Sequence, residues 1–440
     1  MPIEIVRTDA PLADSRVTAL LETLRAAELT SGSAASVRAA VEEILADIRS
    51  RGDAALVDWE RKLDAAELTP ETLRVPAERI EQAHREADGA FLALIRRAAE
   101  NIRRYQEWIK VEPPDPLRRG GRTLGLRYTP VERVGVYVPG MRALYPSTVL
   151  MTVIPAQVAG VGRLALTSPP RADGDVAPLV LALAGELGVE EVYRLGGAVA
   201  VGAFAFGTDS VPRVDQVAGP GNAYVAEAKR QVYGRVGIDS IAGPSEVLVI
   251  ADDTADAAWV AADLLAQAEH DPGSAVLVTT SSELAEAVSG EIDRQLETLE
   301  RADAARAGLA RYSRAFVVPD LDAACDLANA FAAEHLQIIT SDDEAALARV
   351  HNAGAIFVGG HTPVPVGDYY AGPSHVLPTG TTARFFGPLS CNDFLKPSSV
   401  VRYDAEALAE DAEDVADFAR REGLTAHAAA VERRLRGTEG

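Results

Sequence analysis

The feature that most constrains this chain is an alternation of short apolar segments with longer segments of helical periodicity, which begins at Arg133. A helical connection of this length can cross a sheet and return the chain in the same direction, so the strands are expected to pair in parallel through right-handed crossovers. The predicted strands of this first run are residues 134–138, 164–167, 192–195 and 214–217, and the predicted helices are 148–158, 177–187 and 222–233.

A second run of the same kind begins at Glu246. Its predicted strands are residues 247–250, 275–279, 315–318, 336–339 and 355–358, and its predicted helices are 255–267, 282–299, 321–332 and 343–350. Alternating strands and helices are typical of a parallel sheet covered by helices. We therefore predict an α/β protein with two doubly wound, Rossmann-like units that divide near Gly243, Pro244 and Ser245.

Both ends of the chain are predicted to be helical. Residues 37–48 and 76–109 have apolar residues at helical spacing, and the second segment has one apolar stripe. The residues of that stripe are Leu92, Ile95, Ala98 and Ile102. Three prolines then interrupt the chain before a predicted turn at Gly120 and Gly121, and residues 405–435 form a predicted acidic helical tail.

Length and charge restrict the class of function. A chain of 440 residues is too long for one ordinary core, and its formal net charge of −22 repels phosphate backbones and anionic lipid. We therefore expect no nucleic-acid partner and no membrane. The two cysteines, Cys325 and Cys391, cannot build a disulfide framework, and the first residues lack the basic start and apolar run of a signal peptide. A cytoplasmic location follows as an expectation.

Glycine-rich loops offer three candidate cofactor sites. The loop at Gly219 and Gly221 follows a predicted strand and precedes a predicted helix, but Tyr224 stands where a dinucleotide fingerprint has its third glycine. Asn222 would open a helix whose free N–H groups suit a phosphate. A second loop, at residues 160–162, lies before a strand instead of after one, and a third lies at residues 196–197. Each loop taken alone is more often a plain turn than a cofactor site.

Four of the seven histidines stand near acidic or amide residues, which gives a second signal. The groupings are Gln267 with His270, Glu334 with His335, Asp368 with His375, and Glu422 with His427. Nitrogen and oxygen ligands without cysteine suit zinc at an open catalytic site, and they also suit other divalent ions. Because the active sites of parallel sheets gather in loops beyond strand ends, a metal or acid–base site is slightly favoured over four unrelated histidines.

Several longer motifs together resemble those of one enzyme family. In chain order they are VPG at 138–140, PSTVLM at 146–151, GPGNAYV at 219–225, AGPSEV at 242–247, AQAEHDP at 266–272, EHL at 334–336, GDY at 367–369 and GPSH at 372–375. Their common order through nearly the whole chain is far more specific than any single motif. On these residues the sequence resembles the histidinol dehydrogenases.

The resemblance implies a four-electron oxidation of L-histidinol to L-histidine, the last step of histidine biosynthesis, through a bound aldehyde and with two NAD molecules. The implied zinc ligands, for one ion per subunit, are Gln267, His270, Asp368 and His427. His335 would be the general base, and Glu334 would activate the water that hydrates the aldehyde. The implied substrate contacts are Ser245, Gln267, His270, Glu334, Asp368, His375, Glu422 and His427, and the implied NAD contacts are Tyr137, Asn222 and the residue at position 199.

The resemblance also implies a division into domains and a homodimer with shared active sites. The expected parts are an N-terminal arm at 1–30, a first α/β domain at 31–133 with 246–390, an NAD-binding second α/β domain at 134–245, and a C-terminal helical tail at 391–440. In this family the tail reaches the partner subunit, so Glu422 and His427 would complete the partner's site.

The sequence departs from the family pattern at a few positions. The family has glutamine after Gly-Gly-Ala, whereas this chain has Val199, whose side chain cannot form a hydrogen bond. One alternative is therefore a related zinc and NAD dehydrogenase for another small polar alcohol, such as a sulfonated diol, although Ser245, His375 and Glu422 match the histidinol pattern. A second alternative is a catalytically silent zinc-binding homologue. The presence of Glu334 together with His335 argues against it, because the two residues serve no obvious structural purpose.

Overall fold

The computed structural model of this chain describes residues 3–27, 34–140, 146–241, 243–270 and 273–435. Ala242, Asp271 and Pro272, which belong to motifs quoted above, lie outside the described residues. The chain forms two compact units. Unit 1 comprises Met1–Ile109 and Val131–Phe394, and unit 2 comprises Lys110–Pro130 and Leu395–Gly440.

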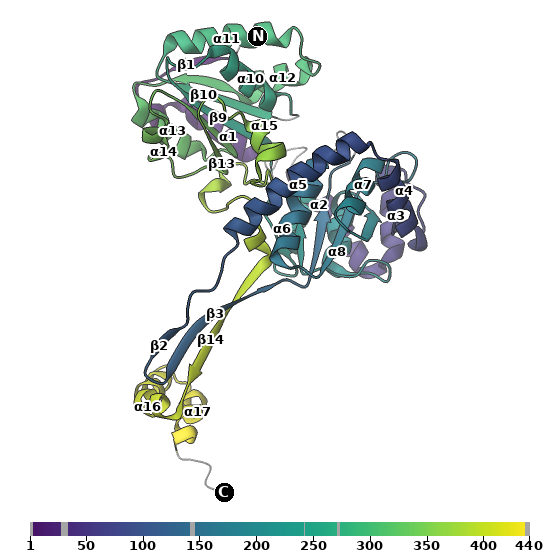
Figure 1. The fold of residues 1–440 in the computed structure, drawn as a ribbon, viewed down its shortest axis with the longest axis vertical. Coiled ribbons are helices and arrows are strands. Elements are labelled where there is room, and N and C mark those ends of the chain that lie inside the picture. The colour runs from purple at the N-terminus through teal and green to yellow at the C-terminus, as the bar shows by residue number, and fades with distance from the viewer. Residues whose placement is uncertain (1–2, 28–33, 141–145, 242, 271–272, 436–440) are drawn as a thin grey trace. The chain divides into compact units, whose positions relative to one another are not determined.

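The first run of strands forms a five-stranded parallel sheet in unit 1 (Figure 1). Its order is β6 (Glu191–Arg194), β5 (Arg163–Ser168), β4 (Arg133–Tyr137), β7 (Gln216–Ala218) and β8 (Gly237–Ile238). The connecting helices are α6 (Pro146–Ala159), α7 (Pro178–Glu186), α8 (Gly197–Phe206) and α9 (Ala223–Val232). The chain starts in the middle of the sheet and reverses its direction of winding between β4 and β7, which makes that point a topological switch point.

Helices from the first quarter of the chain cover this sheet. They are α2 (Ala34–Arg51), α3 (Asp53–Asp64), α4 (Ala77–Glu86) and α5 (Gly89–Ile109). Helix α2 packs on α8 and α9, α4 packs on α7, and α5 packs on α6 with its predicted stripe buried. These contacts group residues 34–109 with the five-stranded sheet, whereas the sequence-based division had joined 31–133 to 246–390. The physical reason is that α6, α7 and α8 are apolar nearly all round and need a second layer of helices.

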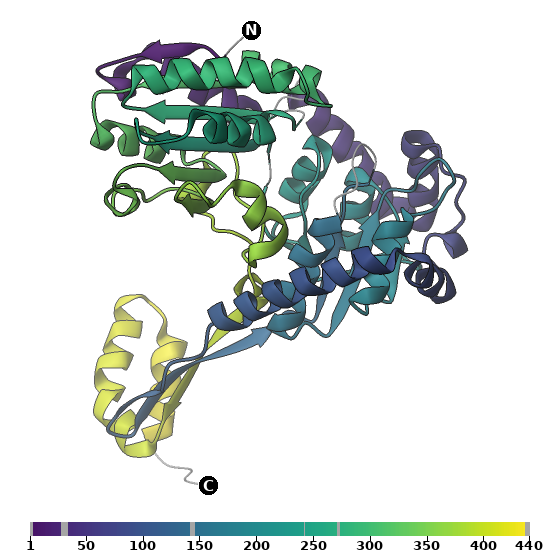
Figure 2. The ribbon, with the colours of Figure 1, turned by 45° about the horizontal axis from the view of Figure 1, so that its top comes forward.

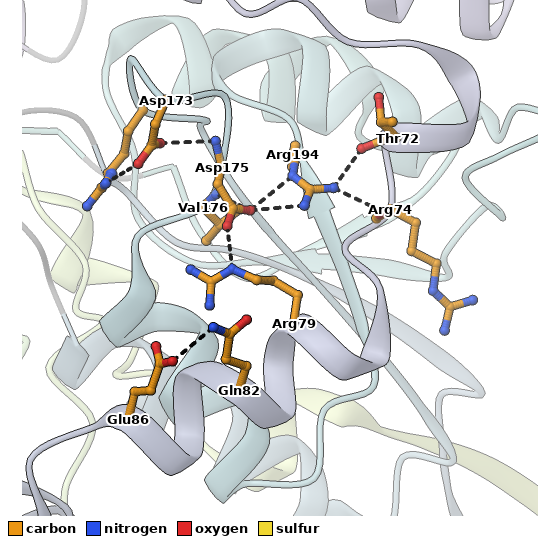
Figure 3. Close-up of polar contacts among 10 residues, drawn as sticks. Thr72, Arg74, Arg79, Gln82, Glu86, Asp173, Asp175, Val176 and Arg194 are labelled. Atoms are coloured by element: carbon orange, nitrogen blue, oxygen red, sulfur yellow. Dashed lines mark hydrogen bonds and ion pairs between the residues drawn. The ribbon is translucent and has the colours of Figure 1, made fainter.

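A polar network fastens this helical layer to the sheet (Figure 3). Asp175 accepts hydrogen bonds from Nε of Arg79 on α4, at 2.8 Å, and from Nε of Arg194 at the end of β6, at 3.0 Å. Arg194 Nη1 also donates to the main-chain oxygens of Thr72, at 2.8 Å, and Arg74, at 3.1 Å. The two arginines therefore link the segment before α4 to the carboxyl end of β6.

The second run of strands forms a six-stranded parallel sheet in unit 1. Its order is β1 (Ile5–Arg7), β11 (Arg314–Val317), β10 (Gly273–Thr279), β9 (Ser245–Ala251), β12 (His335–Ile339) and β13 (Ala355–Val358). Helices α10 (Ala257–Ala268), α11 (Ser282–Leu296) and α12 (Ala302–Tyr312) share one apolar core with it, and α1 (Ser15–Ala27), α13 (Leu321–Phe331) and α14 (Asp343–Leu347) share another (Figures 1 and 2). The prediction of two Rossmann-like parallel sheets is confirmed, and the second switch point lies between β9 and β12.

Unit 2 is a three-stranded antiparallel sheet with two helices. The strands are β14 (Leu395–Tyr403), β3 (Arg122–Pro130) and β2 (Leu117–Arg119), and the helices are α16 (Ala405–Arg421) and α17 (Thr425–Leu435). The helical tail is confirmed, but strand β14 was not predicted within residues 391–440. It lacks an apolar alternation because its residues from Lys396 onward are exposed, and its partner β3 lies far away in the sequence.

The remaining elements are short. They are 3-10 turns at Pro11–Ala13, Pro70–Thr72, Thr382–Arg384 and Cys391–Phe394, the helix α15 (Val364–Val366) and a π-turn at Gly367–Ala371. None of the helices in the described part of the chain is long and apolar enough to cross a membrane.

Candidate active site

The predicted catalytic residues lie at the amino edge of the six-stranded sheet. His335 begins β12 and Ser245 begins β9, and the register of these parallel strands pairs His335 with Val247. Helix α10 runs in the opposite direction to the strands, so its last turn, with Gln267 and then His270, reaches the same edge. Ligands of open parallel sheets usually bind beyond the carboxyl ends of the strands, and this group differs from that rule.

Two carboxylates and one main-chain oxygen surround the His335 ring. Its Nδ1 atom lies 3.0 Å from the carbonyl oxygen of Glu246 and 3.6 Å from Oε2 of Glu334. A carbonyl oxygen only accepts, so Nδ1 carries the proton and Nε2 of the neutral ring keeps its lone pair. Nε2 lies 3.4 Å from Oδ1 of Asp368 and makes no hydrogen bond of ordinary geometry within the described residues.

Burial and neighbouring charges shift the pKa values of this pair. Burial raises the pKa of Glu334, whose Oε2 accepts a hydrogen bond from the main-chain N–H of Glu246 at 2.9 Å and whose carboxylate also interacts with the Ser245 hydroxyl. Burial lowers the pKa of His335, but the carboxylates of Glu334 and Asp368 raise it more, to about 9. The two carboxylates therefore stabilise the charged ring that forms when Nε2 of His335 takes up a proton.

Asp368 and His375 come from the segment that follows β13. Asp368 lies in the π-turn Gly367–Ala371, and its carbonyl oxygen is 3.0 Å from Nδ1 of His375. His375 Nε2 is 3.4 Å from Oγ1 of Thr148 on α6, and Ser374 Oγ donates to the main-chain oxygen of Met151 at 3.2 Å. Burial lowers the pKa of His375. This segment therefore carries Asp368 while it contacts the helix that follows β4.

Three of the predicted metal ligands belong to this group. Gln267 is 4 % exposed, and its Nε2 atom has no hydrogen-bond partner in the described part of the chain. Burial lowers the pKa of His270, and the charge of Asp368 opposes that shift. The buried, unpaired amide of Gln267, together with the imidazole of His270 and the carboxylate of Asp368, fits a cation with nitrogen and oxygen ligands. The amide can direct its oxygen toward the cation if its oxygen and nitrogen exchange places by a 180° rotation.

The described residues contain no group of three or more His, Cys, Asp or Glu side chains arranged to hold a metal. Of the predicted ligands, only His270 and Asp368 are residues of these types in unit 1, since Gln267 is an amide and His427 belongs to unit 2. Glu422, which follows α16, and His427, on α17, both have exposed side chains. Within unit 1, five of the predicted residues interact with His335 or with its carboxylate neighbours: Ser245, His270, Glu334, Asp368 and His375. Gln267, on the last turn of α10, lies at the same edge of the sheet.

The predicted cofactor residues lie at the carboxyl edge of the five-stranded sheet. Tyr137 ends β4, and Asn222 caps α9 by accepting hydrogen bonds from the N–H groups of Tyr224, at 3.0 Å, and Val225, at 3.2 Å. Gly219 has φ +113°, and a Cβ atom there would lie 2.2 Å from the carbonyl oxygen of Tyr137. Only glycine fits this close approach, which brings the loop after β7 against the end of β4, at the switch point.

A buried ion pair holds the Gly219 loop. Lys229 Nζ donates to the Gly219 oxygen, at 2.6 Å, and pairs with Asp239, whose Oδ2 accepts from the Gly219 N–H at 2.7 Å. The side chains of Lys229 and Asp239 are 2 % and 3 % exposed. We call Lys229, Asp239 and Gly219 the loop clamp. Both main-chain polar groups of Gly219 are satisfied by it.

Sequence reasoning missed a carboxyl pair beside the loop at Gly196. Glu60 Oε1 accepts a hydrogen bond from the Gly196 N–H at 2.8 Å, whereas Oε2 has no partner among the residues described. Burial raises the pKa values of both Glu60 and Asp64 on α3. The sequence could have indicated a buried Glu60, because Glu60 follows Leu56 at helical spacing and so lies on the apolar face of α3.

Val199 lies on α8 and is completely buried in the core that α8 shares with α2 and α3. The sequence placed this position at the cofactor. The structure gives the side chain no accessible surface, because α8 is packed on all sides. Tyr137 is also buried, and its hydroxyl lies 3.4 Å from the N–H of Gly197, while burial raises its pKa to about 12.

Comparisons with known proteins agree with these motifs. The sequence model of the histidinol dehydrogenase family matches residues 28–435. The chain is 50 % identical over 400 residues to a histidinol dehydrogenase of Rhodopirellula baltica, covering 91 % of this chain and 87 % of that protein. It is 51 % identical over 399 residues to one of Geobacillus kaustophilus, covering 90 % of this chain and 94 % of that protein. The crystal structure of histidinol dehydrogenase from Elizabethkingia anophelis superposes with a TM-score of 0.91 at 32 % identity, covering 100 % of this chain and 99 % of that one.

Proposed function

Because this chain belongs to the histidinol dehydrogenase family, we propose that it oxidises L-histidinol to L-histidine with zinc and NAD, as an oxidoreductase of histidine biosynthesis. One observation carries the proposal most directly. The buried imidazole of His335 donates through Nδ1 to the Glu246 carbonyl and leaves Nε2 available beside Asp368. A buried histidine with one ring nitrogen held and the other available is suited to general-base catalysis.

The zinc ion would be held by Gln267, His270 and Asp368 of one subunit and by His427. The donor set of one amide, two imidazoles and one carboxylate is compatible with zinc, and the orphaned Gln267 amide supports it. When bound, zinc would hold the imidazole and amino nitrogens of the substrate and so orient its alcohol. Ser245, His375 and Glu422 would make further contacts with the substrate.

In the first oxidation, His335 Nε2 would take the proton of the substrate hydroxyl, and NAD, when bound, would accept the hydride from the carbon. The alcohol loses two electrons and two hydrogens in this step and becomes an aldehyde. Glu334 and Asp368 face the ring that gains the positive charge, so they stabilise the protonated state. The Nδ1 contact with Glu246 keeps the accepting nitrogen pointed toward Asp368.

In the second oxidation, Glu334 takes a proton from the water that adds to the aldehyde carbon. The Ser245 hydroxyl and the Glu246 N–H hold its carboxylate in place. His335 would return the proton of the first oxidation to the aldehyde oxygen as the water adds, which completes the hydrate and restores the neutral ring. The hydrate would then lose hydride to a second NAD while His335 again takes a hydroxyl proton, which leaves the carboxylic acid. The raised pKa of Glu334 brings this carboxyl closer to neutral pH, where a carboxyl acts more effectively as a base.

We place NAD at the carboxyl edge of the five-stranded sheet, near Tyr137 and Asn222. The switch point between β4 and β7, the close approach at Gly219 and the loop clamp support this placement. We do not assign a side-chain contact to Val199, because that side chain is buried.

A homodimer with shared sites would bring His427 and Glu422 of one subunit to the other subunit's substrate. Exposed apolar side chains of unit 2 support a protein partner there, since Leu117 is 67 %, Val401 66 % and Phe418 67 % exposed. A second copy of this chain is the partner that completes the ligand set. The strong negative charge supports the absence of a nucleic-acid or membrane partner, and we propose a cytoplasmic location.

The test is to mix zinc-loaded protein with L-histidinol and excess NAD and to follow NADH to completion. Two NADH per histidinol is the expected result. One NADH per histidinol would contradict the role of Glu334 in the second oxidation. No NADH with zinc present would contradict histidinol as the substrate, and small polar alcohols such as sulfonated diols would then distinguish a related dehydrogenase from a silent homologue.

A further inference from the structure

Two buried polar residues lie behind the candidate zinc site in the core of the six-stranded sheet. Gln337 is in the middle of β12 and is fully buried, and Asp263 is on α10 and is 8 % exposed. Neither residue belongs to the site described above. A polar side chain in the centre of a parallel sheet is uncommon, because such strands are covered on both faces by apolar helices.

The alternation of β12 shows which face Gln337 occupies. Ile339 packs in the core that contains α10, whereas Leu336 and Ile338 pack in the core on the other face. His335, Gln337 and Ile339 therefore point to the same face, toward α10. On α10, Asp263 and Gln267 are four residues apart and also share one face.

The spacing along the two elements matches. Helix α10 ends at the edge where β12 begins, so the two elements run in opposite directions. Four helical residues rise about 6 Å and two strand residues rise about 6.6 Å. The amide of Gln337 interacts with the Asp263 carboxyl, which puts these two residues at the same level. Gln267, one helical turn further along α10, is then at the level of His335.

Three orphaned atoms lie along this line. Gln267 Nε2, Gln337 Nε2 and Gln337 Oε1 are all buried and have no hydrogen-bond partner of ordinary geometry within the described ranges. Buried polar atoms nearly always have partners, so three orphans on facing elements require an explanation. They form a complementary set with Asp263: a carboxylate that accepts, an amide that donates and accepts, and a second amide that donates.

We propose that Gln337 and Asp263 are positioning residues, which set the direction of the Gln267 amide. Asp263 accepts from Gln337 Nε2, Gln337 Oε1 then accepts from Gln267 Nε2, and the Gln267 oxygen is left to face the site. We call these three residues the amide chain. The Asp263 carboxylate sets the direction of the hydrogen bonds in the amide chain, because a carboxylate can only accept. Gln337 must therefore donate to Asp263, and its oxygen is then left to accept from Gln267. The inference rests on the proposed role of Gln267 as a zinc ligand.

The amide chain predicts a loss of zinc affinity when its middle member cannot form hydrogen bonds. Gln337→Met has a similar size and no amide, so it should weaken zinc affinity about 10-fold or more, as is typical for residues that orient metal ligands. The measurement is competition for zinc between apo-protein and a coloured chelator, together with the thermal unfolding of the apo-protein. Gln106→Met is the matched control, since Gln106 is another fully buried glutamine on α5 and should leave zinc affinity unchanged.

A paired exchange tests the direction of the chain. Gln337→Glu alone places a second carboxyl against that of Asp263, and this disruption of the amide chain should weaken zinc affinity. In the double variant D263N/Q337E, Asn at 263 donates to the new carboxylate, which still accepts from Gln267. We expect this variant to recover zinc affinity to within about 3-fold of the wild type, and this comparison remains informative if Gln337→Met does not fold.

The outcomes separate this inference from the proposed function. If Gln267→Ala loses zinc but Gln337→Met and Gln337→Glu bind it like the wild type, the amide chain is wrong and the zinc site stands. If Gln267→Ala itself keeps the wild-type affinity, the zinc assignment fails and the inference fails with it. Loss with Gln337→Met and recovery in the double variant support both.

Discussion

The Nδ1 atom of His335 lies 3.0 Å from the main-chain oxygen of Glu246, a residue 89 positions earlier in the chain. The contact joins β12 to β9 across the switch point of the six-stranded sheet. It determines the tautomer, because the carbonyl can only accept and Nδ1 must then carry the proton. The role of His335 as a base through Nε2 depends on this contact.

Replacing His335 by asparagine should reduce turnover by about 10²- to 10⁴-fold, because asparagine can still donate to Glu246 but cannot take a proton. Zinc content and unfolding temperature should stay close to those of the wild type. The measurement is kcat for NADH formation, and the exposed His351→Asn provides the matched control. Turnover that survives in His335→Asn would contradict the base assignment.

Replacing Glu334 by glutamine should uncouple the two oxidations. Glutamine can still accept from the Glu246 N–H, but it cannot take a proton from water, so aldehyde hydration should slow by about 10²-fold or more. We expect NADH per histidinol to fall from two toward one within the time that the wild type needs for completion. Carbonyl trapping would detect the accumulated aldehyde. An unchanged yield of two NADH would show that another group activates the water.

Shared active sites can be tested with two inactive variants. His335→Asn and His427→Ala should each be inactive as homodimers, and His427→Ala should also lose zinc. Co-expression should restore about a quarter of the wild-type activity, because half of the dimers are hybrids and each hybrid keeps one intact site. No recovery in isolated hybrid dimers would mean that each tail serves its own subunit.

The carboxyl pair beside Gly196 should make stability depend on pH. Burial raises the pKa of Glu60 well above its usual value of 4.5, so the folded protein retains a proton that the unfolded chain releases. The stability is greatest below the unfolded pKa and is lost as the pH rises from there through the folded pKa. Glutamine at position 60 does not titrate. The unfolding temperature of Glu60→Gln should therefore rise relative to that of the wild type as the pH rises from about 4 to 8. Parallel curves of unfolding temperature against pH for the two proteins would contradict the prediction.

The loop clamp should contribute strongly to stability. Lys229→Met leaves the Asp239 carboxylate buried and unpaired, which should cost about 3–5 kcal/mol of unfolding free energy. Urea unfolding measures this cost, and the affinity for NAD measured by fluorescence titration should fall as well. Arg230→Met, the next residue on the same helix, removes a more exposed ion pair with Glu227 and should cost less than about 1 kcal/mol. Equal effects of the two variants would argue against the clamp.

Much of the fold could be predicted because strands and helices have distinct local periods. The predicted strand at residues 355–358 coincides with β13, and the predicted helix at 321–332 is within one residue of α13. Helix α8 was missed because it is apolar all round and so has no stripe. Strands β1 and β14 were missed because each depends on a partner distant in sequence, β11 for the first and β3 for the second.

The motifs identified the candidate site residues, but not where they meet. Local pattern placed Glu334 and His335 at the end of a helix, just before a strand, and the resemblance to a family indicated their partners. The sequence could not show that these residues lie at the amino edge of the six-stranded sheet, because that position depends on how α10 runs back toward the start of β9 and β12. It also missed Glu60, since a carboxylate on an apolar helix face has a function only beside the loop that it contacts.

The sequence by itself determined the order and type of most elements, the two parallel sheets and the set of motif residues, because these follow from local periodicity and residue identity. Only the tertiary structure decided which ring nitrogen of His335 is held, which helices cover which sheet, and which buried amides face each other. These properties arise from contacts between segments that are far apart in the chain. The Glu246 carbonyl determines the tautomer of His335 only because folding places β9 beside β12.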